Sequence, residues 1–315
     1  MSLESVFKCD DKRIIKDLTV YNEYLILKGN GESTRRQNLS YIKKFLLEHG
    51  EFSVKNVYDF LHKKDENGKK KNAKGAMYVY FKKYAKFLLK NKLIDKELFD
   101  DIEEYQRQYK NTRVRDKWKV PYDRWSECYG QLEYEVQRIA IWLGFNFMLR
   151  ANEIINLQWK HINFNDGKYG SIKITETEDH KLKTSNSNRT LPMASHHRQI
   201  LLDYKEKWDN LGLDHDYLVY IPTGEYKNLP ISYKGFYGWC QKVSIIIKVK
   251  GNDVKKILRP HVLRYSGASD LFMKHGINSL YTLSKMLGHN DIKTTQDYLV
   301  VTEKELHEEM LQLFI

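Results

Sequence analysis

The chain has 315 residues, enough for two domains of ordinary size, and its 41% hydrophobic and 30% charged residues are typical of a folded globular protein. No run of 18 or more apolar residues predicts a transmembrane helix, and the start of the chain lacks the basic and then apolar pattern of a signal peptide. We therefore expect a cytoplasmic protein with no membrane partner.

The net charge of +12 is concentrated in the first part of the chain. Residues 1–120 hold 28 Lys and Arg against 18 Asp and Glu, a net charge of +10, whereas residues 121–315 hold 25 against 23, a net charge of +2. Basic proteins attract polyanions, most often nucleic acid. The distribution favours an electrostatic clamp followed by a domain with more specific chemistry; the alternative is a solvated lysine-rich surface.

Residues 1–110 have the apolar spacing that is typical of helices. Ser33 or Thr34 is a candidate N-cap of one helix, Gly50 is a candidate end of it, and Ser53 is a candidate N-cap of the next. After a lysine-rich loop, aromatic residues at spacings of three and four indicate a helix that faces the core. The pattern predicts helices over residues 14–27, 35–47, 54–62, 77–89 and 93–109.

The segment 111–120 is polar and basic, and we interpret it as an interdomain linker that either crosses a DNA backbone or is a solvated tether. Residues 121–315 then combine helices with two short strands around a polar turn at 179–188. The predicted fold class is mainly α with a small antiparallel β-sheet. The strands are expected over 172–177 and 189–193, and the helices over 133–148, 151–157, 195–211, 232–247, 259–275, 279–287 and 303–314.

Basic residues of the first domain are the candidates for contacts with DNA phosphates, which would position the protein without reading bases. They lie on the predicted helix 35–47 and in the lysine-rich loop. The candidates are Arg35, Arg36, Lys43, Lys44, Lys69, Lys70, Lys71 and Lys74.

Two motifs near the end of the chain could act on a phosphate. His261 and Arg264 are three residues apart, so they share a face at the start of a helix, and Pro260 suits its first turn. A helix start favours anions. Gly288 is expected to end a later helix and to present His289 from a loop, nine residues before Tyr298.

Two earlier motifs complete the set of candidate residues. Arg150 lies at a junction between two helices, where its planar guanidinium could bind a phosphate, and Glu153 could pair with it or cap the second helix. Lys183 lies at the predicted turn between the strands, from which it could reach into a cleft. A structural salt bridge and a solvent-facing lysine are the alternative interpretations.

In their order and spacing these motifs resemble those of the tyrosine recombinase family, which includes phage integrases and Xer-type recombinases. The resemblance covers roughly residues 121–300 and fills the six catalytic positions of the family. Those positions are Arg150, Lys183, His261, Arg264, His289 and Tyr298. The resemblance implies a helical core-binding domain of SAM-like type over 1–110, a basic linker over 111–120, and an α+β catalytic domain with a C-terminal tail over 121–315.

The resemblance also implies a reaction. Tyr298 would attack a DNA phosphate and form a 3′-phosphotyrosyl intermediate, with His261 as base and Lys183 as the acid that protonates the departing 5′ oxygen. Arg150, Arg264 and His289 would stabilise the transition state, and Glu153 would orient its neighbours. The implied partners are double-stranded DNA and further copies of the chain, as a tetramer on two DNA sites; a directionality factor is left open.

No cofactor is expected. The three cysteines lie far apart, no His, Cys or carboxylate cluster has the spacing of a metal site, and no GxxxxGK[ST] motif predicts ATP binding. Three alternative functions differ in their support. A type IB topoisomerase uses similar residues, a non-catalytic DNA-binding protein could retain the fold, and an RNA-processing protein has no supporting motif.

Overall fold

The computed structural model describes residues 6–7, 9–62, 74–108, 118–176, 188–249, 251–276, 279–297 and 299–300. The chain divides into two compact units, an N-terminal unit (Met1–Arg115) and a C-terminal unit (Asp116–Ile315), and the boundary between them lies inside the segment 111–120. Each unit has its own hydrophobic core. Among the described residues, no helix is both long and apolar enough to cross a membrane.

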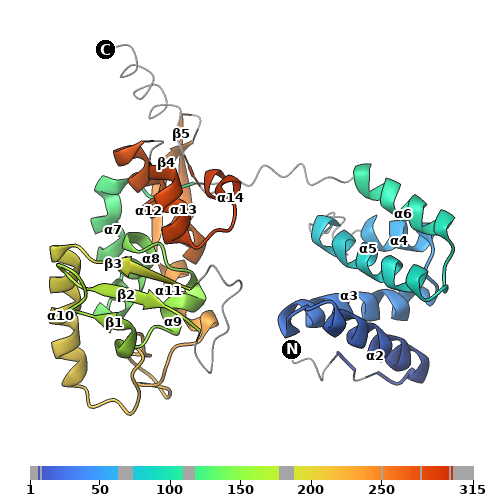
Figure 1. Cartoon of the computed structure of the whole chain (residues 1–315), viewed down its shortest axis with the longest axis horizontal. Helices are drawn as coiled ribbons and strands as arrows, with labels where there is room; N and C mark the ends of the chain where they lie inside the picture. Colours follow the sequence, from blue (N-terminus) through green and yellow to red (C-terminus); the bar gives the residue numbers. More distant parts are fainter. Residues whose placement is uncertain are drawn as a thin grey trace. The chain divides into compact units, whose positions relative to one another are not determined.

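The N-terminal unit is helical over its described residues (Figure 1, blue to cyan). The aromatic residues predicted to face the core do so, since Tyr78, Phe81, Tyr84 and Phe87 are all buried. Phe81 packs against Phe45 of a neighbouring helix with a centroid distance of 5.1 Å. The helices are α2 (Lys12–Leu27), α3 (Glu32–His49), α4 (Val54–His62), α5 (Lys74–Lys90) and α6 (Lys96–Gln108).

The ends of α3 and α4 test the predicted caps. Ser53 is confirmed as the cap of α4, because its Oγ accepts a hydrogen bond of 3.2 Å from the backbone N–H of Asn56. Gly50 ends α3 with a φ of 68°, as predicted. The N-cap prediction for Ser33 or Thr34 was wrong: α3 begins at Glu32 after an extended Gly31. Glu32 is favourable in the first turn because a carboxylate there opposes the helix dipole.

Over its described residues, the C-terminal unit combines helices with two antiparallel sheets, so the predicted fold class is confirmed. Figure 1 shows α8 inside this unit, between the three-stranded sheet and α12. Its helices are α7 (Trp125–Gly130), α8 (Glu135–Asn146), α9 (Ala151–Ile155), α10 (Ser195–Asp209), α11 (Tyr233–Lys242), α12 (Pro260–His275), α13 (Leu280–Leu287) and α14 (Ile292–Gln296). Its strands are β1 (Ile162–Asn163), β2 (Ser171–Ile174), β3 (Arg189–Pro192), β4 (Ser244–Val249) and β5 (Asn252–Ile257). Short 3-10 turns cover Tyr122–Arg124 and Trp159–His161.

The close packing of α8 against α12 places the two central motifs of the unit. A Cβ on Gly267 of α12 would lie 2.0 Å from the backbone oxygen of Phe145, and a Cβ on Gly144 of α8 would lie 2.7 Å from Leu263 Cδ1. Gly267 is therefore required for this approach, because a Cβ there would meet backbone, whereas at Gly144 the nearest atom is the end of a leucine side chain. The approach brings Arg264 on α12 beside the segment that follows α8.

The sheets differ in how well the sequence predicted them. β2 and β3 pair antiparallel, with Ile172 opposite Leu191, on either side of the predicted turn 179–188, of which residues 179–187 lie outside the described part of the chain. The helix predicted over 232–247 was wrong after residue 242, because β4 and β5 form a hairpin there. Four of the five residues 243–247 are β-branched, all but Ser244, and Gly251 adopts the φ of 82° that its turn requires.

The C-terminal end of the predicted linker belongs to the C-terminal unit. Lys119 is buried, and its Nζ lies 3.3 Å from Asp270 Oδ1 on α12. The backbone N–H of Val120 donates to Ser266 Oγ at 2.9 Å. Lys119 is thus not part of a solvated tether. The helix predicted over 303–314 lies outside the described residues.

Candidate functional site

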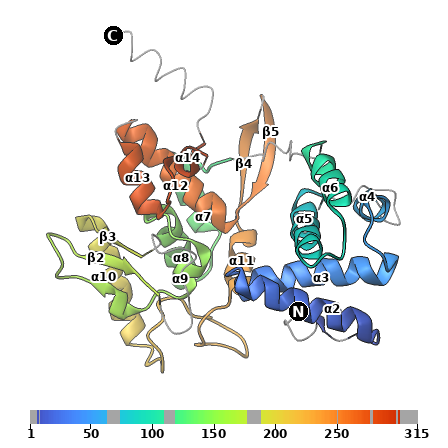
Figure 2. The same cartoon turned by 45° about the vertical axis from the view of Figure 1, so that its right-hand side comes forward.

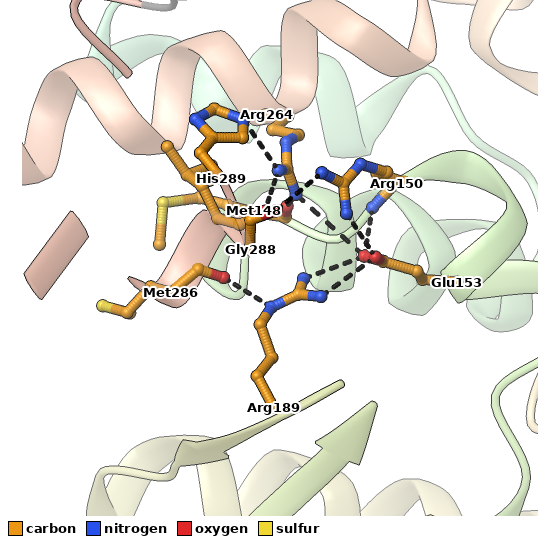
Figure 3. A network of polar contacts seen from close by, with 9 residues as sticks. Met148, Arg150, Glu153, Arg189, Arg264, Met286, Gly288 and His289 are labelled. Carbon is orange, nitrogen blue, oxygen red and sulfur yellow. Dashed lines mark hydrogen bonds and ion pairs between the residues drawn. The ribbon is translucent and has the colours of Figure 1, made fainter. Parts of the chain in front are cut away.

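The side chain of Glu153, on α9, is the centre of a buried polar network (Figure 3). Its Oε1 and Oε2 accept hydrogen bonds of 3.0 and 2.9 Å from Arg189. Oε1 also accepts a bond of 2.9 Å from Arg150, and the backbone N–H of Arg150 donates to Oε2 at 2.8 Å. Glu153 therefore both pairs with Arg150 and caps α9, which joins the two possibilities that the sequence left open.

Arg264 lies beside this carboxylate, and its side chain is 1% exposed. Its guanidinium donates to the backbone oxygens of Met148 and Leu287, and one nitrogen lies 4.0 Å from Glu153. Met148 has a φ of 52°, in the left-handed region that favours glycine. Such strain persists only where the surroundings enforce it, and here the buried Met148 side chain packs against Leu283 and Leu287 while its carbonyl receives Arg264.

His289 completes the network from the loop after α13. Gly288 ends α13 with a φ of 63°, as predicted, and its carbonyl lies 3.3 Å from Arg150 Nη2. His289 Nε2 lies 3.4 Å from Arg264 Nη2, and Nδ1 lies 2.9 Å from Thr295 Oγ1. Because arginine can only donate, Nε2 is the acceptor, and Nδ1 carries the proton of the neutral ring and donates it to Thr295.

The charges in the network set two pKa values. Burial by itself would raise the pKa of Glu153, but the hydrogen bond and charge of Arg189, with the charges of the other two arginines, lower it to about 2. Burial, reinforced by the charges of Arg264 and Arg150, lowers the pKa of His289 to about 4. At neutral pH the carboxylate is ionised and the imidazole is neutral.

The network has an excess of positive charge. Three arginines stand against one carboxylate, which leaves two positive charges on buried or half-buried groups. Arg150 is the most accessible of the three, with 25% of its side chain exposed. An anion with several oxygens, such as a phosphate diester, is the ligand that this arrangement suits chemically.

The structure brings together four of the residues that the sequence singled out, namely Arg150, Glu153, Arg264 and His289. His261 lies one turn before Arg264, in the first turn of α12 after Pro260; it is exposed, and its ring stacks on Tyr265 with a centroid distance of 6.1 Å. On the face of α12 that His261 and Arg264 were expected to share, His261 is exposed and Arg264 is buried. Lys183 and Tyr298 lie outside the described residues.

The basic candidates of the N-terminal unit lie on α3 where they are described. Arg35 is half-buried and donates to Asn22 Oδ1 at 3.1 Å. Arg36 and Lys43 are half-buried, and Lys44 is exposed. Lys74 begins α5, and the loop lysines Lys69, Lys70 and Lys71 lie outside the described residues.

Sequence reasoning missed Arg189 and Thr295. Arg189 was assigned only to a strand, and its isolated position beside a polar turn gave no sign that it reaches Glu153. Thr295 follows the Gly288 and His289 motif by a few residues, so its place in a short helix next to the loop could have suggested a contact with His289. Neither residue has a local pattern that identifies a polar network.

The chain is similar to known proteins in its sequence and in its fold. The model of the phage integrase family matches residues 126–305. Tyrosine recombinase XerA of Pyrococcus horikoshii is 23% identical over 299 residues, which cover 92% of this chain and 91% of the relative.

Two solved structures share the fold. The Tn1549 transposon integrase in complex with transposon right end DNA has a TM-score of 0.67 at 13% identity, over 95% of this chain and 99% of the other. A lambda integrase tetramer bound to a Holliday junction has a TM-score of 0.63 at 16% identity, over 88% of this chain and 77% of the other. The family match spans more than half of the chain and includes the whole Glu153 network, and the chain therefore belongs to the phage integrase family.

Proposed function

We propose that this chain is a site-specific DNA recombinase that cuts and rejoins strands through a 3′-phosphotyrosyl intermediate. The observation that carries the proposal is the Glu153 network, which gathers Arg150, Arg264 and His289 with an excess of positive charge. Family membership and full-length similarity to a tyrosine recombinase support the same reaction and do not favour a topoisomerase or a non-catalytic protein.

Tyr298 is the proposed nucleophile. A phenol has a pKa near ~10, so it needs a base and strong stabilisation of the charged transition state. His261 would take the phenolic proton while the phenolic oxygen attacks phosphorus, and Lys183 would give a proton to the 5′ oxygen as its bond to phosphorus breaks. The phosphotyrosyl bond retains the energy of the phosphodiester, so a 5′ hydroxyl from another strand can reverse the step.

Arg150 and Arg264 would stabilise the non-bridging oxygens of the pentacoordinate phosphorus, as an oxyanion hole stabilises a tetrahedral intermediate. In the present state Arg264 donates to the carbonyls of Met148 and Leu287. Five N–H donors are available on a guanidinium, so a phosphate can be bound in addition to these carbonyls. The carbonyls would hold Arg264 in place for it.

His289 would donate a hydrogen bond to the same phosphate, and this requires a change of tautomer. The ring now has its proton on Nδ1, with Nε2 facing Arg264. A threonine hydroxyl can both donate and accept. When a phosphate oxygen approaches Nε2, the ring would release its Nδ1 proton to solvent and take up a proton from solvent at Nε2, which would point at the phosphate. Thr295 would then turn its hydroxyl to donate to Nδ1.

The test is covalent attachment of the protein to DNA. Purified protein would be incubated with nicked DNA fragments from its own genomic neighbourhood, without added metal or ATP, and analysed on denaturing gels. We expect an adduct with the unaltered chain and with Tyr281→Phe, an exposed tyrosine on α13, but none with Tyr298→Phe. An adduct that persists in Tyr298→Phe would mean that another residue is the nucleophile, and DNA binding without any adduct would contradict the proposed reaction.

The basic N-terminal unit is the proposed core-binding domain, with α3 and the loop lysines as its phosphate contacts. Assembly on DNA is the second part of the proposal, and the solved lambda integrase tetramer on a Holliday junction supports it by analogy. We propose a tetramer on two DNA sites, in which residues after Val301 dock on a neighbouring copy.

Deleting these residues should weaken assembly on DNA more than binding by one copy, as measured by native gels and analytical ultracentrifugation. Unchanged assembly would contradict the docking. A directionality factor remains a prediction.

A further inference from the structure

Arg189 is the most completely bound arginine side chain of the network, and it belongs to none of the sequence motifs that predicted the site. It is the first residue of β3, and its side chain is 7% exposed. Its two terminal nitrogens bind the two oxygens of Glu153 at 3.0 and 2.9 Å, and its Nε donates to the backbone oxygen of Met286 at 2.6 Å. This is the planar bidentate geometry that only arginine supplies.

The bidentate pair changes what Glu153 requires of its other neighbours. A buried carboxylate needs a charged partner, and Arg189 satisfies both of its oxygens. Arg150 makes one side-chain bond to Glu153 and keeps 25% of its side chain exposed, and Arg264 stays 4.0 Å away. Without Arg189, the same carboxylate would draw these two guanidinium groups toward itself and away from an incoming phosphate.

The contact with Met286 connects the network to the loop that carries His289. Met286 lies in the last turn of α13, directly before the Leu287 carbonyl that receives Arg264 and the Gly288 turn. Arg189 thereby ties together β3, α9 and the end of α13 (Figure 3). Arg189 begins β3, the strand that the sequence analysis placed directly after the predicted turn containing Lys183.

We propose that Arg189 is a positioning residue for strand cleavage, which neutralises Glu153 and holds the end of α13 so that Arg150 and Arg264 remain available to the phosphate. The inference rests on the proposed recombinase function. It predicts a defect in the chemical step and in its pH dependence, with DNA affinity little changed, because the Arg189 side chain is buried and bound to Glu153 and Met286.

The experiment uses the full chain and a suicide substrate, a nicked duplex built on the cleavage site that sequencing of the adduct's DNA identifies. Single-turnover cleavage, DNA affinity and melting temperature would be measured for Arg189→Met, Arg189→Lys and Arg124→Met. Arg124 is the matched control, since it binds both oxygens of Glu127 at 2.6 Å and the carbonyl of Ile246, on the surface of the same unit.

We expect cleavage by Arg189→Met to be about 10- to 100-fold slower, the loss typical of a catalytic group displaced by about 1 Å, and cleavage by Arg124→Met to be unchanged. The acid limb of the pH profile should move to higher pH in Arg189→Met, because burial then raises the pKa of Glu153 with less opposition. The double variant Arg189→Met/Glu153→Gln should cleave faster than Arg189→Met, since it removes the uncompensated carboxylate.

The outcomes distinguish a failure of the proposed recombinase function from a failure of the role proposed for Arg189. If the unaltered chain forms no adduct, the proposed function fails. If it does, and Arg189→Met cleaves as fast as Arg124→Met or the double variant is slower still, the role of Arg189 is overturned. Should Arg189→Met not fold, Arg189→Lys with and without Glu153→Gln provides the same comparison, because lysine keeps the charge and loses the bidentate contact.

Discussion

The buried side chain of Glu153 connects the three arginines of the polar network. Its side chain is 2% exposed, and three arginines lie within 4.0 Å of it. A carboxylate in this position is stable only while it is charged and paired. Glu153 therefore holds the guanidinium groups of its neighbours in place, and its own burial depends on their charge.

The low pKa of Glu153 predicts a pH-dependent contribution to stability. The folded value of about 2 lies below the value of about 4.3 for an unfolded glutamate, so the stabilisation is complete above pH ~4.5 and is lost as the pH falls toward 2. Its size is at most about 3 kcal/mol. Glu153→Gln should melt at a lower temperature than the unaltered chain at pH 7, and calorimetry should show this gap narrowing below about pH 4. A gap that stays constant down to pH 2.5 would argue against a strongly lowered pKa.

Thr295 should matter through a single hydrogen bond. Its Oγ1 lies 2.9 Å from His289 Nδ1, and both residues are buried. Thr295→Val keeps the shape and removes the hydroxyl, so cleavage should slow by about 5- to 10-fold, which corresponds to about 1 kcal/mol. Thr295→Ser should retain most of the rate in the same suicide-substrate assay. Equal rates for the Val and Ser variants would mean that the hydroxyl does not set the tautomer of His289.

At the scale of elements, α12 is the point where distant segments meet. Ser266 receives the N–H of Val120, Asp270 binds Lys119, and Ser269 accepts a hydrogen bond of 2.8 Å from the N–H of Val300. The helix that carries Arg264 thus also holds the segment that enters the C-terminal unit and the segment that follows position 298. A displacement of α12 would therefore disturb Arg264 and both of these segments.

The α8 and α12 contact offers a test of this dependence. Gly267→Ala would place a Cβ 2.0 Å from the Phe145 oxygen, and the resulting shift should destabilise the C-terminal unit by about 1–3 kcal/mol and slow cleavage. Gly238→Ala on α11 is the control, because its Cβ meets nothing within 4 Å and alanine favours the helix by up to about 1 kcal/mol. Thermal unfolding should show a lower melting temperature than that of the unaltered chain for Gly267→Ala and a higher one for Gly238→Ala. Equal stability of the two variants would mean that α8 and α12 can separate at little cost in free energy.

At the scale of the whole molecule, charge and chemistry are divided between the two units. The N-terminal unit, residues 1–115, holds 26 Lys and Arg against 17 Asp and Glu, a net charge of +9, whereas the Glu153 network lies entirely in the C-terminal unit. Phosphate contacts supply affinity that falls with salt, because binding releases counterions. The N-terminal unit is therefore expected to determine how strongly binding depends on salt.

Replacing Arg36, Lys43 and Lys44 with glutamine should reduce the slope of log affinity against log salt concentration by about 0.9 for each DNA phosphate that the variant no longer neutralises. Fluorescence anisotropy over a salt series would measure this slope. The double variant Lys205→Gln/Lys207→Gln is the control, since both lysines are paired with acidic residues in the C-terminal unit. An unchanged slope in the α3 variant would move the DNA-binding surface to the loop lysines or to the C-terminal unit.

The sequence by itself determined the helical N-terminal unit, the β2 and β3 pairing, the Gly288 turn and four members of the polar network. These features depend on apolar periodicity, caps and motif spacing, which are local along the chain. The same local signals failed at 243–257, because the apolar run there fits a helix as well as a strand. The Gly251 turn and the packing against α7 select the hairpin. Gln131, which follows α7, uses both the nitrogen and the oxygen of its side-chain amide to bind the backbone of Ser244.

Only the tertiary structure decided how the network is connected. Arg189 reaches Glu153 across 36 residues of sequence, and Arg150 reaches Gly288 across 138. Lys119 became a buried ion pair instead of a linker residue for the same reason. A charged side chain is buried only where a partner of opposite charge or a set of carbonyls meets it, and that meeting depends on the packing of α8, α9, α12 and α13, which no local pattern encodes.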